Sequence, residues 1–154
     1  MSDSLLNLIS GSPEETEAIG AALAKRIVDG GEELPRFIAL YGDLGSGKTA
    51  FVRGFTSYIS PKSAVRSPTF TIVNEYRGGK TPVFHFDMYR IDGEDDLYSI
   101  GFYEYLSAGI CLSEWSENIE FALPEEYIRL EISRIGTDDD QLNKRSIVAE
   151  IIRE

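Results

Sequence analysis

Apolar residues spaced four positions apart predict a helix near the start of the chain. Ile19, Leu23 and Ile27 fall on one face of a helix with 3.6 residues per turn. The preceding run Ser12-Pro13-Glu14-Glu15 supplies an N-cap, a proline suited to the first helical position and an acid placed for a capping box. Gly30 and the glycine after it end the pattern, so the helix is expected between Ser12 and Gly30.

Short apolar or alternating runs, bounded by glycine, proline and charged residues, predict strands elsewhere. The runs are 36–41, 70–76, 81–86, 109–113, 127–132 and 146–152, with 5–9 as a candidate edge strand. A turn separates 70–76 from 81–86, which predicts a hairpin or a neighbouring pair, and a charged turn separates 127–132 from 146–152, which predicts an antiparallel hairpin. Helical spacing is expected from 48 to about 59, and in two short helices over 94–106 that break at Gly101.

A glycine-rich segment joins the strand at 36–41 to the helix that follows. It reads Gly42-Asp43-Leu44-Gly45-Ser46-Gly47-Lys48-Thr49 and matches G-x-x-x-x-G-K-[ST], the phosphate-binding P-loop. Its glycines let main-chain N–H groups approach an anion, and the helix N-terminus adds its positive end. The motif predicts binding of a nucleoside triphosphate; the alternative is a glycine-rich turn that matches by chance.

The order of these elements predicts one P-loop domain over residues 1–154. Its expected fold is a three-layer α/β P-loop NTPase fold with a mostly parallel central sheet and antiparallel strands toward the C-terminus. Within it, the Lys48 ammonium would bridge the β- and γ-phosphates, and the Thr49 hydroxyl would lie where a magnesium ion binds.

Two acids come directly after apolar strands. Asp87 follows 81–86 and Glu114 follows 109–113. A parallel strand beside the P-loop strand delivers its last residue to the metal, and we expect the strand of Asp87 to be that neighbour. Glu114 competes for the same role because it too ends an apolar strand. The alternative for Asp87 is a strand-ending residue that caps the next turn.

Five further features each leave two interpretations open. Ser67-Pro68-Thr69 is either a loop that senses the γ-phosphate or an ordinary loop. His85, the one histidine, is expected to be structural and hydrogen-bonded rather than a catalytic base. Arg90 suits a phosphate or a surface ion pair, and Trp115 a buried anchor or an aromatic near the nucleotide. Thr16, taken alone, is expected to be a solvated helix residue.

The composition indicates a soluble protein without a basic surface. There are 15 Lys and Arg residues against 26 Asp and Glu, a formal net charge of −11, whereas proteins that grip nucleic acid alone present a basic face. If no partner protein is involved, the acidic composition is interpreted as keeping the protein soluble. No membrane span or signal peptide is evident, and a single cysteine excludes an internal disulfide, so a cytoplasmic location is expected.

Four motifs together resemble the TsaE (YjeE) family, the ATPases of tRNA threonylcarbamoyladenosine modification. They are the P-loop, Ser67-Pro68-Thr69-Phe70, His85-Phe86-Asp87-Met88-Tyr89-Arg90 and Glu114-Trp115. The resemblance covers nearly the whole chain. It implies ATP and Mg²⁺ as cofactors and a TsaB–TsaD complex as the partner. In that complex TsaD transfers the threonylcarbamoyl group, and tRNA is met only through the complex, with no role for DNA or membranes.

The resemblance also implies roles for single residues. Asp87 and Lys48 would be catalytic, and Thr49 and Glu114 would bind magnesium, with Asp87 supporting hydrolysis or the metal's water shell. The nucleotide would be held by Asp43, Leu44, Gly45, Ser46, Gly47, Lys48, Thr49, Ala50, Thr16 and Trp115. Some relatives carry a Gly-Arg pair in the final hairpin; this chain has 141–145 there, and no nucleotide contact is carried over to Arg145.

Two other functions fit a P-loop protein of this size. A small-molecule kinase would need an arginine-rich lid, and only Arg90 lies between Asp87 and Glu114. A nucleotide-dependent binding module would bind ATP without hydrolysing it. No guanine-recognition motif is present, and ATP as the nucleotide rests on the family resemblance.

Overall fold

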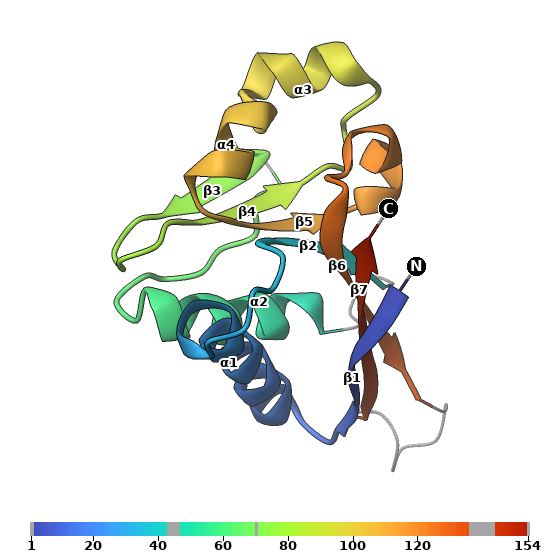
Figure 1. Ribbon diagram of the computed structural model, residues 1–154. Coiled ribbons are helices and arrows are strands. Elements are labelled where there is room, and N and C mark those ends of the chain that lie inside the picture. The colour runs from blue at the N-terminus through green and yellow to red at the C-terminus, as the bar shows by residue number, and fades with distance from the viewer. Residues whose placement is uncertain (1, 43–46, 70, 136–143, 154) are drawn as a thin grey trace.

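A seven-stranded sheet with helices on both faces makes up the computed structural model (Figure 1), which describes residues 2–42, 47–69, 71–135 and 144–153. The strands are β1 (Ser2–Ser10), β2 (Phe37–Tyr41), β3 (Val73–Tyr76), β4 (Val83–Asp87), β5 (Ile110–Glu114), β6 (Glu126–Arg134) and β7 (Arg145–Arg153). The helices are α1 (Pro13–Asp29), α2 (Lys48–Ile59), α3 (Glu94–Ile100), α4 (Phe102–Ala108) and the 3-10 helix η1 (Ser116–Ala122).

The sheet is parallel at its centre and antiparallel at both ends. Its order is β1-β7-β6-β2-β5-β4-β3. The P-loop strand β2 pairs in parallel with β5 and β6, and β5 pairs in parallel with β4. The pairs β3–β4, β6–β7 and β1–β7 are antiparallel. The predicted mixed α/β fold and the predicted antiparallel hairpin of the last two strands are confirmed, as is the edge strand at the N-terminus. Of the two arrangements left open for 70–76 and 81–86, the antiparallel hairpin is the one observed.

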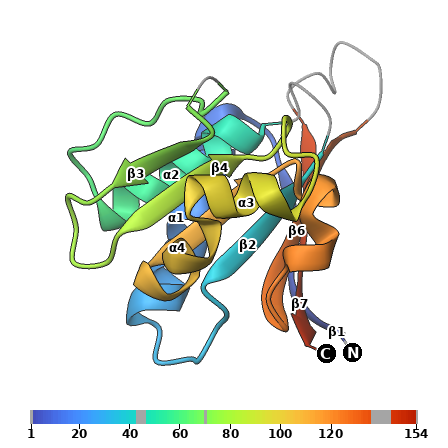
Figure 2. The ribbon, with the colours of Figure 1, turned by 90° about the horizontal axis from the view of Figure 1, so that it is seen from above.

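Helices α1 and α2 cover one face of the sheet, and α3 and α4 cover the other (Figures 1 and 2). Under α1 and α2 lies a buried, mainly aliphatic core that includes Leu23, Ile38 and Leu130. The opposite face is richer in aromatic side chains. There Phe102 contacts Phe86 edge to face, with ring centroids 5.6 Å apart. The parallel strands β2, β4 and β5 are therefore buried on both faces, whereas β6 alternates between buried and more exposed residues.

The start of α1 follows the predicted capping chemistry. Ser12 Oγ accepts a hydrogen bond from the Glu15 N–H at 3.1 Å, and Pro13 occupies the first turn. Glu15 Oε2 in turn accepts from the Gly11 N–H at 2.6 Å, one residue before the N-cap. These contacts satisfy N–H groups that a helix end leaves without an intrahelical partner, so the boundary is set locally.

The strand predicted over 70–76 is shorter than its alternating pattern. It begins at Val73, because Ile72 has a left-handed backbone (φ 70°) that interrupts extended pairing. Phe70, where the pattern starts, lies outside the described residues. Alternation reports which side chains face the core, whereas strand bounds depend on backbone hydrogen bonds, so the prediction extended too far.

The helices are modest in length. The longest, α1, has 17 residues and carries six acidic or basic side chains, and α2 has 12 residues. A bilayer span takes about 20 mostly apolar residues. Within the described ranges, no helix combines the length and the apolar character that crossing a membrane requires.

Candidate nucleotide-binding site

The carboxyl ends of three neighbouring strands meet beside the start of α2. Leu40 of β2 is in register with Glu114 of β5, and Glu114 is in register with Asp87 of β4. Because the strands are parallel, both acids reach the same sheet edge as the P-loop. A cleft of about 360 Å³ opens there, lined by Pro13, Gly47, Lys48, Thr49, Ser67, Thr69, Asp87, Glu114, Trp115 and Arg145.

The N-terminus of α2 is an anion-binding helix end by its local structure. Its N-cap is Gly47, whose left-handed backbone (φ 109°) is one that glycine adopts without steric cost, and no side chain caps the helix. The first turn holds no acidic residue. Its N–H groups and the positive end of the helix dipole are therefore left for an external anion. The predicted site residues Asp43, Leu44, Gly45 and Ser46 lie outside the described residues.

Lys48 is held close to the cleft by backbone and aromatic contacts. Its side chain is largely buried, and Nζ donates a hydrogen bond to the Gly42 carbonyl at 2.5 Å. The same nitrogen lies 5.9 Å from the centre of the Trp115 ring, within the range of a cation–π contact. A partly desolvated ammonium beside an uncapped helix end favours a polyphosphate as the bound anion.

The two strand-end acids have different surroundings. Glu114 Oε2 lies 2.5 Å from Nε2 of the buried His85, while Asp87 Oδ1 accepts a hydrogen bond from the Tyr89 N–H at 3.0 Å. The expectation that the strand of Asp87 neighbours the P-loop strand is wrong: β5, which ends in Glu114, lies beside β2, and β4 lies one strand further. Strand order depends on how crossover connections pack, which periodicity does not encode.

The donor set of the cleft suits magnesium. Thr49 contributes an exposed hydroxyl, and Glu114 and Asp87 contribute carboxylates. Among the described residues, no group of three or more His, Cys, Asp or Glu side chains gathers as a metal cage. Magnesium in nucleotide sites uses one or two protein carboxylates together with phosphate and water oxygens, so these few hard oxygen donors fit it.

Trp115 follows Glu114 in an uncommon backbone conformation. Its φ is 59°, in the left-handed region that non-glycine residues rarely adopt, and its ring contacts Tyr89 edge to face with centroids 4.9 Å apart. Strain of this kind is concentrated at functional sites. The half-buried ring lines the cleft and also packs against the aromatic core on the α3 and α4 face, so both predicted surroundings of Trp115 are present.

The loop containing Ser67-Pro68-Thr69 also faces the cleft. Ser67 and Thr69 both line it, and their hydroxyl oxygens are 2.6 Å apart. The Ile72 N–H donates to the Pro68 carbonyl at 2.8 Å, and the Asp87 N–H donates to the Ile72 carbonyl at 2.8 Å. Two hydrogen bonds in series therefore link the loop to the backbone of Asp87.

A second hollow of about 460 Å³ shares Lys48 and Trp115 with the cleft. It is lined by Tyr41, Gly42, Lys48, Trp115, Glu117, Arg129 and Glu131. The Arg129 guanidinium stacks over the Tyr41 ring at 4.3 Å. Burial, together with the nearby Tyr127, raises the pKa of Tyr41 to about 12, so this phenol stays protonated at neutral pH. The hollow presents both charge signs, with Lys48 and Arg129 beside Glu117 and Glu131.

Comparison with known proteins identifies the family. A sequence profile described as "Threonylcarbamoyl adenosine biosynthesis protein TsaE" matches residues 10–147. The chain belongs to the TsaE family. A TsaE relative from Bacillus subtilis is 42% identical over 132 residues, 85% of this chain and 79% of its own length. One from Rickettsia bellii is 33% identical, over 86% of this chain and 88% of its own.

A solved structure agrees with the TsaE assignment at the level of the fold. The crystal structure of YdiB from Bacillus subtilis has a TM-score of 0.74 and 32% sequence identity, covering 99% of this chain and 88% of that one. The predicted P-loop NTPase fold is therefore confirmed, and a nucleotide site at the start of α2 is what the TsaE family and this fold imply.

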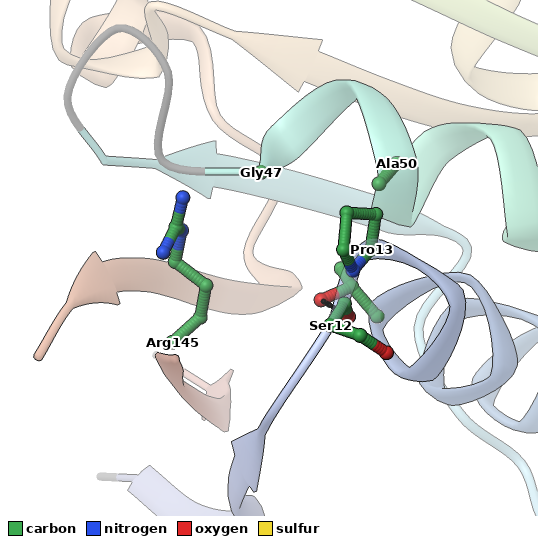
Figure 3. A pocket seen from close by; sticks show the side chains of 6 residues that line it. Ser12, Pro13, Gly47, Ala50 and Arg145 are labelled. Carbon is green, nitrogen blue, oxygen red and sulfur yellow. Dashed lines mark hydrogen bonds between the residues drawn. The ribbon is translucent and has the colours of Figure 1, made fainter. Parts of the chain in front are cut away.

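The surroundings of two residues of this TsaE-family chain were not evident from their local sequence. Thr16 is not a solvated helix residue: its exposed fraction is 2%, and its Oγ1 lies 2.7 Å from Ser10 Oγ. Arg145, to which no nucleotide contact was carried over from the family, lines the cleft. It also borders a hollow of about 60 Å³ (Figure 3) together with Ser12, Pro13, Thr16, Gly47 and Ala50.

Arg145 reaches the TsaE-family site through the fold rather than through a local motif. It opens β7, and Figure 3 shows its side chain directed toward Gly47. A Cβ added to Gly47 would lie 3.9 Å from Arg145 Nε. Burial and the neighbouring Arg134 lower the pKa of the Arg145 guanidinium, an effect that a bound anion would oppose. A basic residue at the start of the final strand was the available signal.

Proposed function

We propose that this TsaE-family chain is a magnesium-dependent ATPase that acts on a TsaB–TsaD complex and does not itself transfer the threonylcarbamoyl group. Family membership supports the coarser role, in tRNA threonylcarbamoyladenosine biosynthesis. ATP hydrolysis, the metal and the partner complex are the parts that the proposal adds.

One observation carries the proposal of hydrolysis. Lys48 and the uncapped start of α2 lie in the same cleft as Thr49, Glu114 and Asp87. A module that only bound phosphate would need the first two features alone. The two carboxylates add a ligand for a metal cation and an oxygen that can orient the attacking water. Phosphoryl transfer to water requires both.

The reaction transfers the γ-phosphoryl group of ATP to water. The water oxygen bonds to the γ-phosphorus, the bond from that phosphorus to the bridging oxygen breaks, and ADP leaves with the bond's electrons. Lys48 and the N–H groups at the start of α2 stabilise charge on the phosphate oxygens. The Asp87 carboxylate orients the attacking water, whose proton ends on the phosphate product. Thr49 and Glu114 would hold magnesium, which supplies further charge neutralisation.

The chain alone is expected to turn over slowly. Arginines that stabilise the transition state accelerate related reactions by factors of about 10³–10⁵. Arg90 is exposed and does not line the cleft, whereas Arg145 does. We infer that Arg145 alone does not complete the site and that the TsaB–TsaD complex stimulates hydrolysis, by completing the site or by ordering the Ser67–Thr69 loop.

Phosphate release from ATP in water, with no added acceptor, tests the proposal. The rate should be low for the chain alone, should rise when TsaB–TsaD is added and should fall strongly in Asp87→Ala in both conditions. Equal rates with and without the complex would refute the partner claim. No phosphate release in either condition, together with intact tRNA modification by Asp87→Ala, would favour a nucleotide-dependent binding module.

A further inference from the structure

A buried histidine contacts the cleft acid Glu114 from within the core. His85 lies on β4 with an exposed fraction of 1%, and its Nε2 is 2.5 Å from Glu114 Oε2. Glu114 itself is 14% exposed and lines the cleft. The pair therefore links a side chain that solvent does not reach to one that a ligand can reach.

Sheet register explains why these two side chains meet. His85 is directly opposite Leu112 on the neighbouring parallel strand, and Glu114 lies two residues further along the same face. Diagonal neighbours of this kind are within reach of long side chains. The residues around His85 on that face, Val83 and Leu112, belong to the aliphatic core under α1 and α2. A polar ring in such surroundings is costly unless it is hydrogen-bonded.

The contact also defines which ring nitrogen carries hydrogen. A carboxylate oxygen accepts hydrogen bonds, so Nε2 must be the donor toward Glu114. Within the described part of the chain, Nδ1 has no hydrogen-bond partner, so the ring's polar contact there is with Glu114. A side chain with one donor at the position of Nε2 could therefore replace the histidine.

We propose that His85 is a positioning residue for metal binding: its Nε2–H holds one oxygen of Glu114 and leaves the other to bind magnesium. The inference rests on the proposed function, in which Glu114 is a metal ligand. A free glutamate side chain loses rotamer freedom when it binds a metal, and a partner that fixes it beforehand removes part of that cost. Supporting hydrogen bonds to metal ligands are worth about 10- to 100-fold in affinity.

The test measures metal affinity directly, with Mn²⁺ as a spectroscopic probe. Mn²⁺ is titrated into the full chain with bound ADP and followed by electron paramagnetic resonance. His85→Leu, which removes the donor, should weaken Mn²⁺ binding by about tenfold or more. His85→Gln, which keeps a donor, should remain close to wild type. ADP affinity in EDTA should be unchanged in both variants.

Two controls separate positioning from a general loss of structure. Thr56→Val removes a different buried polar group, the Thr56 hydroxyl on α2. This hydroxyl has no hydrogen-bond partner among the described residues, so the variant should leave Mn²⁺ affinity unchanged. Circular dichroism and the melting temperature check each variant. If His85→Leu folds poorly, His85→Met is used in its place, because methionine fills irregular core space and has no comparable donor.

A double-mutant cycle with Glu114→Gln gives the decisive outcome. If His85 acts through Glu114, His85→Leu should have almost no further effect on Mn²⁺ affinity once Glu114 is changed. A folded His85→Leu variant with wild-type Mn²⁺ affinity, beside a weakened Glu114→Gln, would overturn the role of His85 alone. Unchanged affinity in Glu114→Gln would overturn the metal assignment in the proposed function as well.

Discussion

At the scale of single residues, the cleft combines one constrained cation with two acids that are held differently. Lys48 Nζ is anchored on the carbonyl of Gly42, the residue directly after β2. Glu114 is held from the core by His85, and Asp87 by the Tyr89 N–H. Because each of the three side chains has a different contact, substitutions of Lys48, Glu114 and Asp87 should affect different steps of binding and hydrolysis.

Replacement of Lys48 by alanine should reduce nucleotide affinity by roughly 10- to 100-fold, because a charged hydrogen bond contributes about 1.5–3 kcal/mol. The fold should persist, since the lost contact is at the cleft. Isothermal titration with ATP measures the effect, and circular dichroism checks the fold. Lys25→Ala, an exposed lysine on α1, is the matched control. Unaltered affinity in Lys48→Ala would argue against phosphate binding at this helix end.

Glu114→Ala should shift the magnesium dependence of hydrolysis more than Asp87→Ala does. Glu114 ends the strand beside the P-loop strand, whereas Asp87 lies one strand away and is engaged in capping the next turn. Asp87→Ala should keep ATP affinity and lose most of the hydrolysis rate. Magnesium titrations of the rate in both variants provide the comparison, and superimposable curves would contradict this division of roles.

At the scale of elements, boundaries set by local chemistry were predictable from sequence. The start of α1 follows from Ser12, Pro13 and Glu15, and the break between α3 and α4 from Gly101, whose backbone is left-handed (φ 72°). The contact between α1 and α2 was not predictable. It depends on Gly20 and Gly54, two glycines inside helices, whose role appears only when the second helix is in place.

Gly54→Ala should destabilise the protein by about 1–3 kcal/mol, the usual cost of overpacking, and by more if α1 is forced to separate from α2. An added Cβ would lie 1.9 Å from the Glu17 carbonyl oxygen on α1. Urea unfolding followed by circular dichroism measures the change. Gly93→Ala is the matched control, since a Cβ there meets nothing within 4 Å. Equal stability of the two variants would mean that the helices can adjust at little cost.

At the scale of the whole molecule, the order of the strands determined what the sequence could reveal about the site. The P-loop and both strand-end acids were evident because each is a short motif beside an apolar run. That β5 lies beside β2, that His85 supports Glu114 and that Arg145 reaches the cleft all depend on pairing between distant segments. Local patterns carry little information about such pairing.

The net charge of −11 leads to a prediction for the isolated protein: it should not retain tRNA at physiological salt. Tight binding to a phosphate backbone requires a dense cationic surface, and repulsion should dominate here. Fluorescence anisotropy with labelled tRNA measures this, with TsaB–TsaD added as the positive comparison. Salt-dependent binding by the chain alone would indicate a local basic surface and would remove the need for a partner to hold the RNA.

The pairing of β1 with β7 sets the order in which the protein can assemble during translation. Asp3 and Arg153 form an ion pair across these strands although they lie 150 positions apart. On the ribosome, β1 emerges first and has no sheet edge to join until β7 has been made and has paired with β6. Arg145 arrives with the same strand. In a nascent chain, the P-loop helix α2 and both strand-end acids are therefore synthesised well before β7 and Arg145 complete the lining of the cleft.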